Sequence, residues 1–150
     1  MSALKSLNEY GHSFSLKVIN SLLKERQFLL NVRDTIEIEH FEHIGHRYIV
    51  EHILEYFDKY HSPPNLEYFS VEVKKLDNEV LQTAIKEQLK SIYSLENEDK
   101  EYVEQEFSEF GINQKLKKAL LESVDLLNTG QYEEIRTTIE NALKAGQDKN

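Results

Sequence analysis

The sequence predicts an all-α protein, with a compact helical head of about five helices followed by a long antiparallel helical hairpin. Strong helix formers are abundant and helix breakers are rare, with five glycines and two prolines among 150 residues. Apolar residues recur at three- and four-residue steps, which is the spacing of one face of a helix. Residues 36–39 alternate as a strand would, but they are too few and lack an evident pairing partner, so we expect a loop there. We divide the chain into a head with an N-terminal arm (1–96), the hairpin (97–146) and the start of a linker (147–150).

The N-terminal part of the head is predicted to hold a short arm and two helices. Residues up to about Gly11 are polar with scattered apolar positions and form the arm. The first helix fits 13–23, with Ser13 as its N-cap, because Phe14, Val18 and Leu22 follow at helical spacing. The second helix begins at residue 24 or 25 and ends near residue 32.

The strongest helical pattern in the first half of the chain covers residues 43–60. It ends before Pro63 and Pro64, which cannot continue a helix. Asn65 is then a candidate N-cap for a helix that ends at about Leu76.

The last helix of the head is predicted to begin after Asp77 or Asn78, either of which can serve as its N-cap. Its inner face consists of Val80, Leu81, Ala84, Ile85, Leu89 and Ile92. The charged stretch 95–100 then joins the head to the hairpin.

The hairpin is predicted over residues 102–143, with a tight turn at 128–130. Gly130 can take the left-handed conformation that ends a helix without steric cost. Gly111 lies within the first arm, where glycine costs roughly 1 kcal/mol relative to alanine, and we expect a kink or break there.

The first arm of the hairpin is apolar over more than one stripe. Ala119, Leu121 and Leu126 lie off the line that joins Leu116 to Leu127, and one shorter helix cannot cover both sets. A helix with a wide apolar surface either is buried in its own domain or faces another molecule. We therefore expect the hairpin to be an association element.

Composition restricts the class of function. Acidic residues outnumber basic ones by 27 to 18, which gives a net charge of −9 and opposes nucleic-acid binding by the domain as a whole. The chain has no cysteine, which excludes disulfides and thiolate metal sites and fits a reducing compartment. No signal peptide and no apolar run of about 20 residues is evident, so we expect a cytoplasmic protein that does not enter membranes.

The histidines suggest one metal-binding hypothesis. His40, His43 and His46 are three residues apart, with Glu39 or Glu42 as a further ligand. However, residues at successive three-residue steps drift around a helix, so three of them rarely converge on one ion. We favour ordinary packing or surface roles for these histidines, and no metal.

Nothing in the sequence indicates catalysis or a bound cofactor. His12 and Ser13 are adjacent but lack a nucleophile elbow and a carboxylate partner, and capping explains Ser13 better. The pair Glu133–Glu134 fits a solvated helix N-terminus. There is no phosphate-binding loop of either common type. We therefore name no catalytic residue and expect no enzyme activity.

Several short stretches carry a family resemblance. Residues 45–57 contain a His-Arg pair that opens a helix of the form H-R-x-I-(F/V)-x-x-I, with an acidic residue and an aromatic ahead of it in 38–41. A short proline-containing loop at 63–66 opens the next helix, and 116–120 and 130–135 stand at the hairpin arms. In this order they resemble the N-terminal domain of DnaB-type replicative DNA helicases, most closely that of tailed-phage replicative helicases.

The resemblance implies a non-catalytic collar domain. Such domains associate through heads and hairpins, form a hexamer in the full-length ATP-dependent helicase, and dock primase and the helicase loader. An ATPase domain would follow residue 150, and the protein would act in the host cytoplasm if it is phage-encoded. Expected partners are other copies of the chain as a dimer or larger homo-oligomer, primase and the loader, with little direct nucleic-acid binding. We expect the self-association surface to include Leu116, Leu120, Leu121, Val124, Leu127, Ile135 and Ile139.

An alternative from a different class remains open. The chain can be a free-standing helical adaptor or regulatory protein that binds a partner through its hairpin and belongs to no ATPase. A small enzyme is a third reading, but it needs a convergent set of polar groups that the sequence does not provide.

Overall fold

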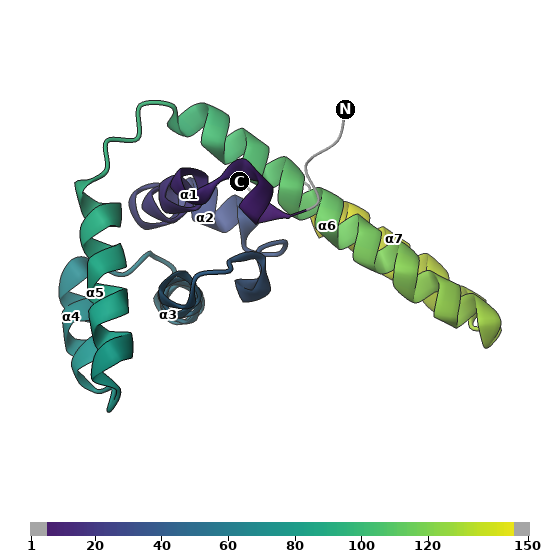
Figure 1. Cartoon of the computed structure of the whole chain (residues 1–150). Helices are drawn as coiled ribbons and strands as arrows, with labels where there is room; N and C mark the ends of the chain where they lie inside the picture. Colours follow the sequence, from purple (N-terminus) through teal and green to yellow (C-terminus); the bar gives the residue numbers. More distant parts are fainter. Residues whose placement is uncertain (1–5, 146–150) are drawn as a thin grey trace.

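The computed structural model describes residues 6–145, and these confirm an all-α fold with a head and a hairpin. The described residues form seven α-helices and two short 3-10 helices, without any strand. In chain order these are η1 Leu7–Tyr10, α1 His12–Lys24, α2 Arg26–Val32, η2 Ile38–His40, α3 Ile44–Tyr60, α4 Leu66–Lys74, α5 Glu79–Ser94, α6 Lys100–Asn128 and α7 Tyr132–Ala145. α1 to α5 gather in the head, while α6 runs out of it with α7 alongside (Figure 1). Within this part of the chain, no helix is long and apolar enough to cross a membrane.

Side-chain caps fix the starts of α3, α4 and α5. The side chains of Asn65 and Asn78 accept hydrogen bonds from the backbone N–H groups of Tyr68 and Leu81, at 3.0 and 3.1 Å. The predicted cap at Asn65 is therefore confirmed, and of the two candidates Asp77 and Asn78 the structure selects Asn78. His43 caps α3 in the same way, because its Nδ1 accepts the N–H of Gly45 at 2.9 Å.

The structure corrects several predictions in the first third of the chain. Ser13 is not an N-cap, because α1 begins at His12 and its N-cap position is Gly11. The positive φ of Gly11, 98°, lets the chain turn directly from η1 into α1, which places Ser13 inside the helix. Within the predicted arm, Leu7–Tyr10 form η1, which buries Leu7 in the core. The predicted loop at 36–39 overlaps the 3-10 helix η2.

The core of the head takes side chains from α6 as well as from α1 to α5. Val103, Phe107 and Phe110 lie in the first half of α6 and are each at most 1% exposed. Phe107 contacts the rings of Phe28 and Phe41, each at 6.1 Å between centroids. The division at residue 96 stays a prediction, but the head needs the start of α6 to complete its core.

Gly111 does not break α6, which corrects that part of the prediction. The helix is continuous through it, and the residue is buried. A Cβ built on Gly111 would lie 2.6 Å from Oγ1 and 3.0 Å from Cβ of Thr35. Glycine is therefore favoured here because the buried side chain of Thr35 packs directly against the helix and leaves no room for a Cβ.

The turn between the hairpin helices lies where the sequence predicts it. α6 ends at Asn128, and Gly130 has a φ of 72°. The N–H of Gln131 then donates to the carbonyl of Leu126 at 2.9 Å, and that of Gly130 donates to Leu127 at 3.1 Å. These bonds satisfy carbonyls at the end of α6 and reverse the chain. The linker predicted at 147–150 lies outside the described residues.

Candidate functional site

The two helices of the hairpin pack through small and apolar side chains. Ala119 of α6 and Ala142 and Ala145 of α7 are nearly fully buried, and Leu126 is partly buried. Alanine at these positions lets the two helices approach closely. α6 and α7 make the most extensive contact between any two helices in the described part of the chain.

Large apolar side chains on the hairpin remain exposed to solvent. The exposed fractions are 59% for Leu120, 56% for Val124, 57% for Leu127, 68% for Tyr132 and 55% for Leu143. We refer to these five residues as the apolar face. Leu121, which is 62% exposed, lies beside them on α6.

Helix geometry places the five residues on one side of the hairpin. Leu120 and Leu127 each follow an inward-facing residue of α6 by one position, and Leu143 follows the inward-facing Ala142 of α7. One position is a rotation of about 100° around the helix axis. Because the helices are antiparallel, the same rotation carries both sets to the same side of the pair. Tyr132 lies about three turns before Leu143 and shares that side.

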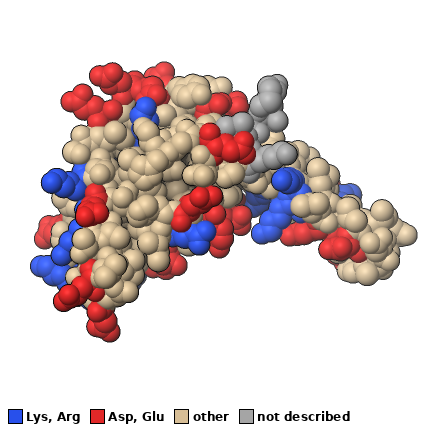
Figure 2. Space-filling model, viewed as in Figure 1, with Lys and Arg blue, Asp and Glu red and all other residues tan. Residues whose placement is uncertain are grey.

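The opposite side of the hairpin is polar and lies against a loop of the head. Lys115 donates from Nζ to the carbonyl of Asp34 at 2.9 Å, and Lys118 Nζ lies 3.6 Å from a carboxylate oxygen of Glu37. These residues line a polar cleft of about 290 Å³ together with Asn141. The hairpin is therefore amphipathic, and no described residue covers its apolar face at the tip. In Figure 2 the end of the hairpin is largely free of charged side chains, and basic side chains appear nearer the head.

The structure divides the seven residues predicted for self-association into two groups. Four are more than half exposed: Leu120, Leu121, Val124 and Leu127. The other three, Leu116, Ile135 and Ile139, are only partly exposed because they lie toward the contact between α6 and α7. Self-association itself stays a prediction.

Tyr132 and Leu143 were not predicted as surface residues. Both fit the helical spacing of α7, which does not by itself distinguish them from its inner residues. Their angular position around the helix distinguishes them from the inner residues. Each lies at the edge of the apolar stripe, next to a charged residue, Glu133 for Tyr132 and Lys144 for Leu143.

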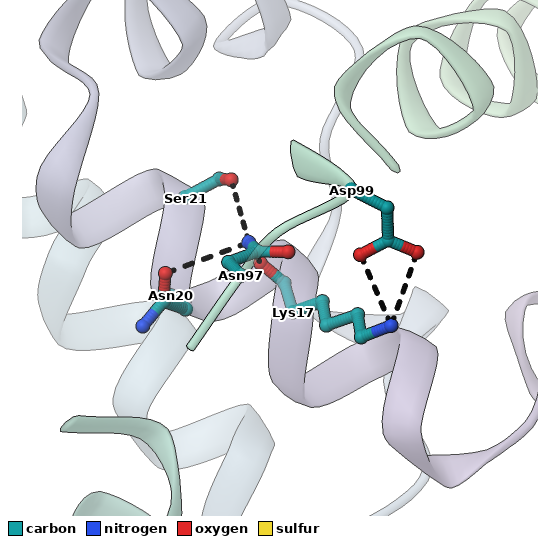
Figure 3. Close-up of polar contacts among 5 residues, drawn as sticks. All are labelled: Lys17, Asn20, Ser21, Asn97 and Asp99. Carbon is teal, nitrogen blue, oxygen red and sulfur yellow. Dashed lines mark hydrogen bonds and ion pairs between the residues drawn. The ribbon is translucent and has the colours of Figure 1, made fainter. Parts of the chain in front are cut away.

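A polar network fixes the hairpin to the head where α6 begins (Figure 3). The Nδ2 of Asn97, in the connection between α5 and α6, lies 3.1 Å from the carbonyl of Lys17 and 3.2 Å from the hydroxyl of Ser21. It is also 3.5 Å from Oδ1 of Asn20, whose own Nδ2 donates to the carbonyl of Ile92 at 2.9 Å. Asn97 thereby ties the connection to α1.

Two ion pairs strengthen the same joint. Lys17 Nζ lies 3.1 Å from the carboxylate of Asp99 (Figure 3). Lys100 Nζ lies 3.0 Å from the carboxylate of Glu25. Both pairs are partly exposed, so each contributes little free energy by itself. With the buried network they orient the first turn of α6, and hence the direction in which the hairpin projects.

The histidines that gather in the structure are not the three considered as metal ligands in the sequence. His12, rather than His40, joins His43 and His46, with ring centroids 5.3 Å apart for His12 and His46 and 4.8 Å for His43 and His46. His40 packs against the ring of Phe110 at 5.0 Å instead. No group of three or more histidine, aspartate or glutamate side chains among residues 6–145 is arranged to hold a metal ion.

His46 is the most perturbed of these histidines. Its side chain is buried, and its Nε2 lies 2.7 Å from Oε1 of Gln88 on α5. Burial lowers the pKa of His46 to about 4, in spite of the hydrogen bond to Gln88. The imidazole is therefore neutral at physiological pH and serves packing between α3 and α5.

No protein-family model, no curated protein and no solved structure matches the chain.

Proposed function

We propose that this chain is the non-catalytic N-terminal collar domain of a hexameric, DnaB-type replicative DNA helicase, and that copies associate through the apolar face. The observation that carries the proposal is the set of large apolar side chains, more than half exposed, on one side of a projecting hairpin. Primase and the helicase loader are the further partners proposed for the assembled collar. The parent protein would supply the ATPase, and this domain would supply the contacts between subunits.

The energetics of the apolar face support association between copies. Burying the exposed half of a leucine or valine side chain stabilises a complex by roughly 1 kcal/mol. Two copies that pair through five large apolar residues each therefore gain about 10 kcal/mol, which exceeds an entropic cost of association of about 5 kcal/mol and leaves a weak dimer. We expect an isolated domain that associates at high concentration and dissociates on dilution.

The positions that carry the family resemblance have structural roles, as a collar domain requires. Ile49, Val50 and Ile53 are fully buried in the core of the head. Arg47 donates from Nε to the carbonyl of Phe41 at 2.6 Å, which holds the segment before α3. The His-Arg pattern in this chain is thus a packing motif. It supports the proposal because it helps to build the fold of the head, and it implies no catalytic role.

The proposal predicts that Leu120→Glu weakens self-association. The substitution places a charge in a contact that must exclude water, and we expect the dissociation constant to rise by about tenfold or more. Sedimentation velocity over a concentration series measures this constant. The matched control is Val80→Glu on α5, which makes the same change of charge at an apolar residue. The sequence predicted Val80 to face inward, but it is 80% exposed in the structure.

The outcomes separate the two classes of function. Weaker self-association in Leu120→Glu, with no change in Val80→Glu, supports the collar proposal. Equal affinity in both variants and the wild type removes the hairpin from the interface. A wild-type chain that stays monomeric at about 1 mM favours the alternative, a free-standing adaptor whose apolar face binds a different protein.

A further inference from the structure

A second candidate surface lies on the head, in a groove between α4 and α5. The two helices pack side by side at the edge of the head farthest from the hairpin tip (Figure 1). The groove has a volume of about 610 Å³, which is within the range of ligand and peptide sites. Phe69, Val73 and Leu89 form its apolar floor, and Leu66, which is 47% exposed, lies at its mouth.

The rim of this groove is basic, although the chain as a whole carries a net charge of −9. Lys74 lines it from α4, and Lys86 and Lys90 line it from α5. No carboxylate lies among its lining residues, and none of the three lysines forms an ion pair within residues 6–145. The remaining ionisable group in the wall is Tyr93, and burial raises the pKa of this tyrosine to about 12, so it adds no negative charge.

The arrangement of floor and rim specifies the shape and charge of an occupant. An apolar floor between two helices accepts the apolar stripe of a third helix. Lys86 and Lys90 are four residues apart and face the same side of α5, which matches carboxylates spaced one turn apart. Lys74 stands on the other helix, so acidic residues are expected on both flanks of the stripe.

We infer that the groove between α4 and α5 binds an amphipathic helix of another protein, with an apolar stripe flanked on both sides by Asp or Glu residues. This surface is separate from the apolar face of the hairpin and does not depend on self-association. The groove gives the chain a second surface for a partner protein. The lysines on its rim make it select helices with acidic flanks.

The test uses a designed probe and charge-reversed variants. A fluorescent helical peptide of about 18 residues carries leucines on one face and glutamates on both flanks, and its anisotropy is measured with the full chain at low salt. We expect binding to the wild type that weakens by about tenfold or more in the double variant Lys86→Glu/Lys90→Glu. The matched control is Lys24→Glu/Lys59→Glu, which changes the net charge equally at lysines outside the groove and should bind as the wild type does.

Two further reagents separate the groove from a general charge effect. A peptide with the same leucines but lysine flanks should not bind. Ser70→Trp fills the groove from an exposed position of α4 and should abolish binding without reversing any charge.

Specific results would overturn the inference. These are absence of binding of the glutamate peptide at about 1 mM, equal binding of the lysine peptide, or equal affinity of the groove variants and the wild type. A loss of self-association in Lys86→Glu/Lys90→Glu, with peptide binding unchanged, would also overturn it and assign the groove to a second copy of this chain.

Discussion

At the scale of single residues, His46 and Gly111 owe their roles to neighbours that are distant in the sequence. His46 is enclosed by Gln88 and by the rings of His12 and His43. Gly111 is pressed against Thr35. A substitution at either position should therefore change the stability of the fold by an amount that the residue type by itself does not explain.

The burial of His46 predicts that stability falls as the pH is lowered. Its folded-state pKa of about 4 lies below the unfolded value of 6.5, so the unfolded state binds more protons in the window between them. The stability contribution is complete above about pH 6.5 and declines toward pH 4. We expect a loss of about 2 kcal/mol between about pH 7 and pH 5, measured by urea unfolding.

A pair of variants isolates this contribution from the carboxylates. His46→Gln removes the titrating group and should flatten the pH dependence over that window. His61→Asn, at an exposed residue with a left-handed conformation that asparagine tolerates, should leave the dependence unchanged. If His46→Gln loses stability with pH as steeply as the wild type does, His46 is not the responsible group.

Gly111→Ala is expected to destabilise the fold, although alanine is the better helix former. The gain in helix propensity is about 1 kcal/mol. The new Cβ would meet Oγ1 of Thr35 at 2.6 Å, and we expect the resulting shift to outweigh that gain and leave a net loss of about 1–3 kcal/mol. Thermal unfolding measures it, and Thr35→Ala should reduce the loss by removing the closest atom. If Gly111→Ala is as stable as the wild type, the segment that carries Thr35 moves away from α6 without a measurable cost, and the prediction is wrong.

At the scale of elements, α6 performs two tasks along one helix. Its first half buries Phe107 and Phe110 in the head, and its second half exposes Leu120 and Val124 on the hairpin. The joint at Asn97 orients the first turn and thereby positions the whole helix. A change at the joint is therefore expected to reach the hairpin.

Asn97→Ala should loosen this joint. It removes the amide that lies between the carbonyl of Lys17 and the hydroxyl of Ser21, and leaves a buried acceptor without its partner. We expect a loss of about 1–3 kcal/mol, with faster hydrogen exchange in the first turns of α6. The control is Asn128→Ala, at the exposed end of the same helix. Unchanged exchange at residues 100–107 would mean that the apolar core positions α6 without the network.

At the scale of the whole molecule, the net charge of −9 opposes the association of identical copies. The apolar face must overcome this repulsion, whereas the groove between α4 and α5 attracts acidic segments. The two surfaces should therefore respond to salt in opposite directions.

Raising NaCl from about 50 to 500 mM is expected to strengthen self-association a few-fold, because screening reduces repulsion and leaves apolar contacts intact. The same change should weaken binding of the acidic peptide to the groove. Sedimentation and fluorescence anisotropy at both salt concentrations measure the two effects. Self-association that weakens with salt would indicate an interface built from ion pairs instead of the apolar face.

The sequence by itself determined the all-α class, the approximate extent of the helices, the cap at Asn65, a cap at Asp77 or Asn78, and the turn at Gly130. These features depend on groups within a few residues of one another: helical spacing, a side chain that accepts a nearby N–H, and a residue that tolerates positive φ. The prediction of Ser13 as an N-cap was wrong for a reason that is also local. Gly11 ends η1 and is itself the N-cap position of α1, so Ser13 lies inside the helix.

Only the tertiary structure decided which of the apolar residues of the hairpin are covered. The sequence placed Ala119, Leu120 and Leu121 in one broad apolar surface, but the position of α7 buries the first and leaves the other two exposed. The close approach of Thr35 to Gly111, and the meeting of His12 with His46, likewise depend on the packing of distant segments. Helical periodicity defines the faces of a helix, whereas the choice of the buried face depends on where its neighbours pack.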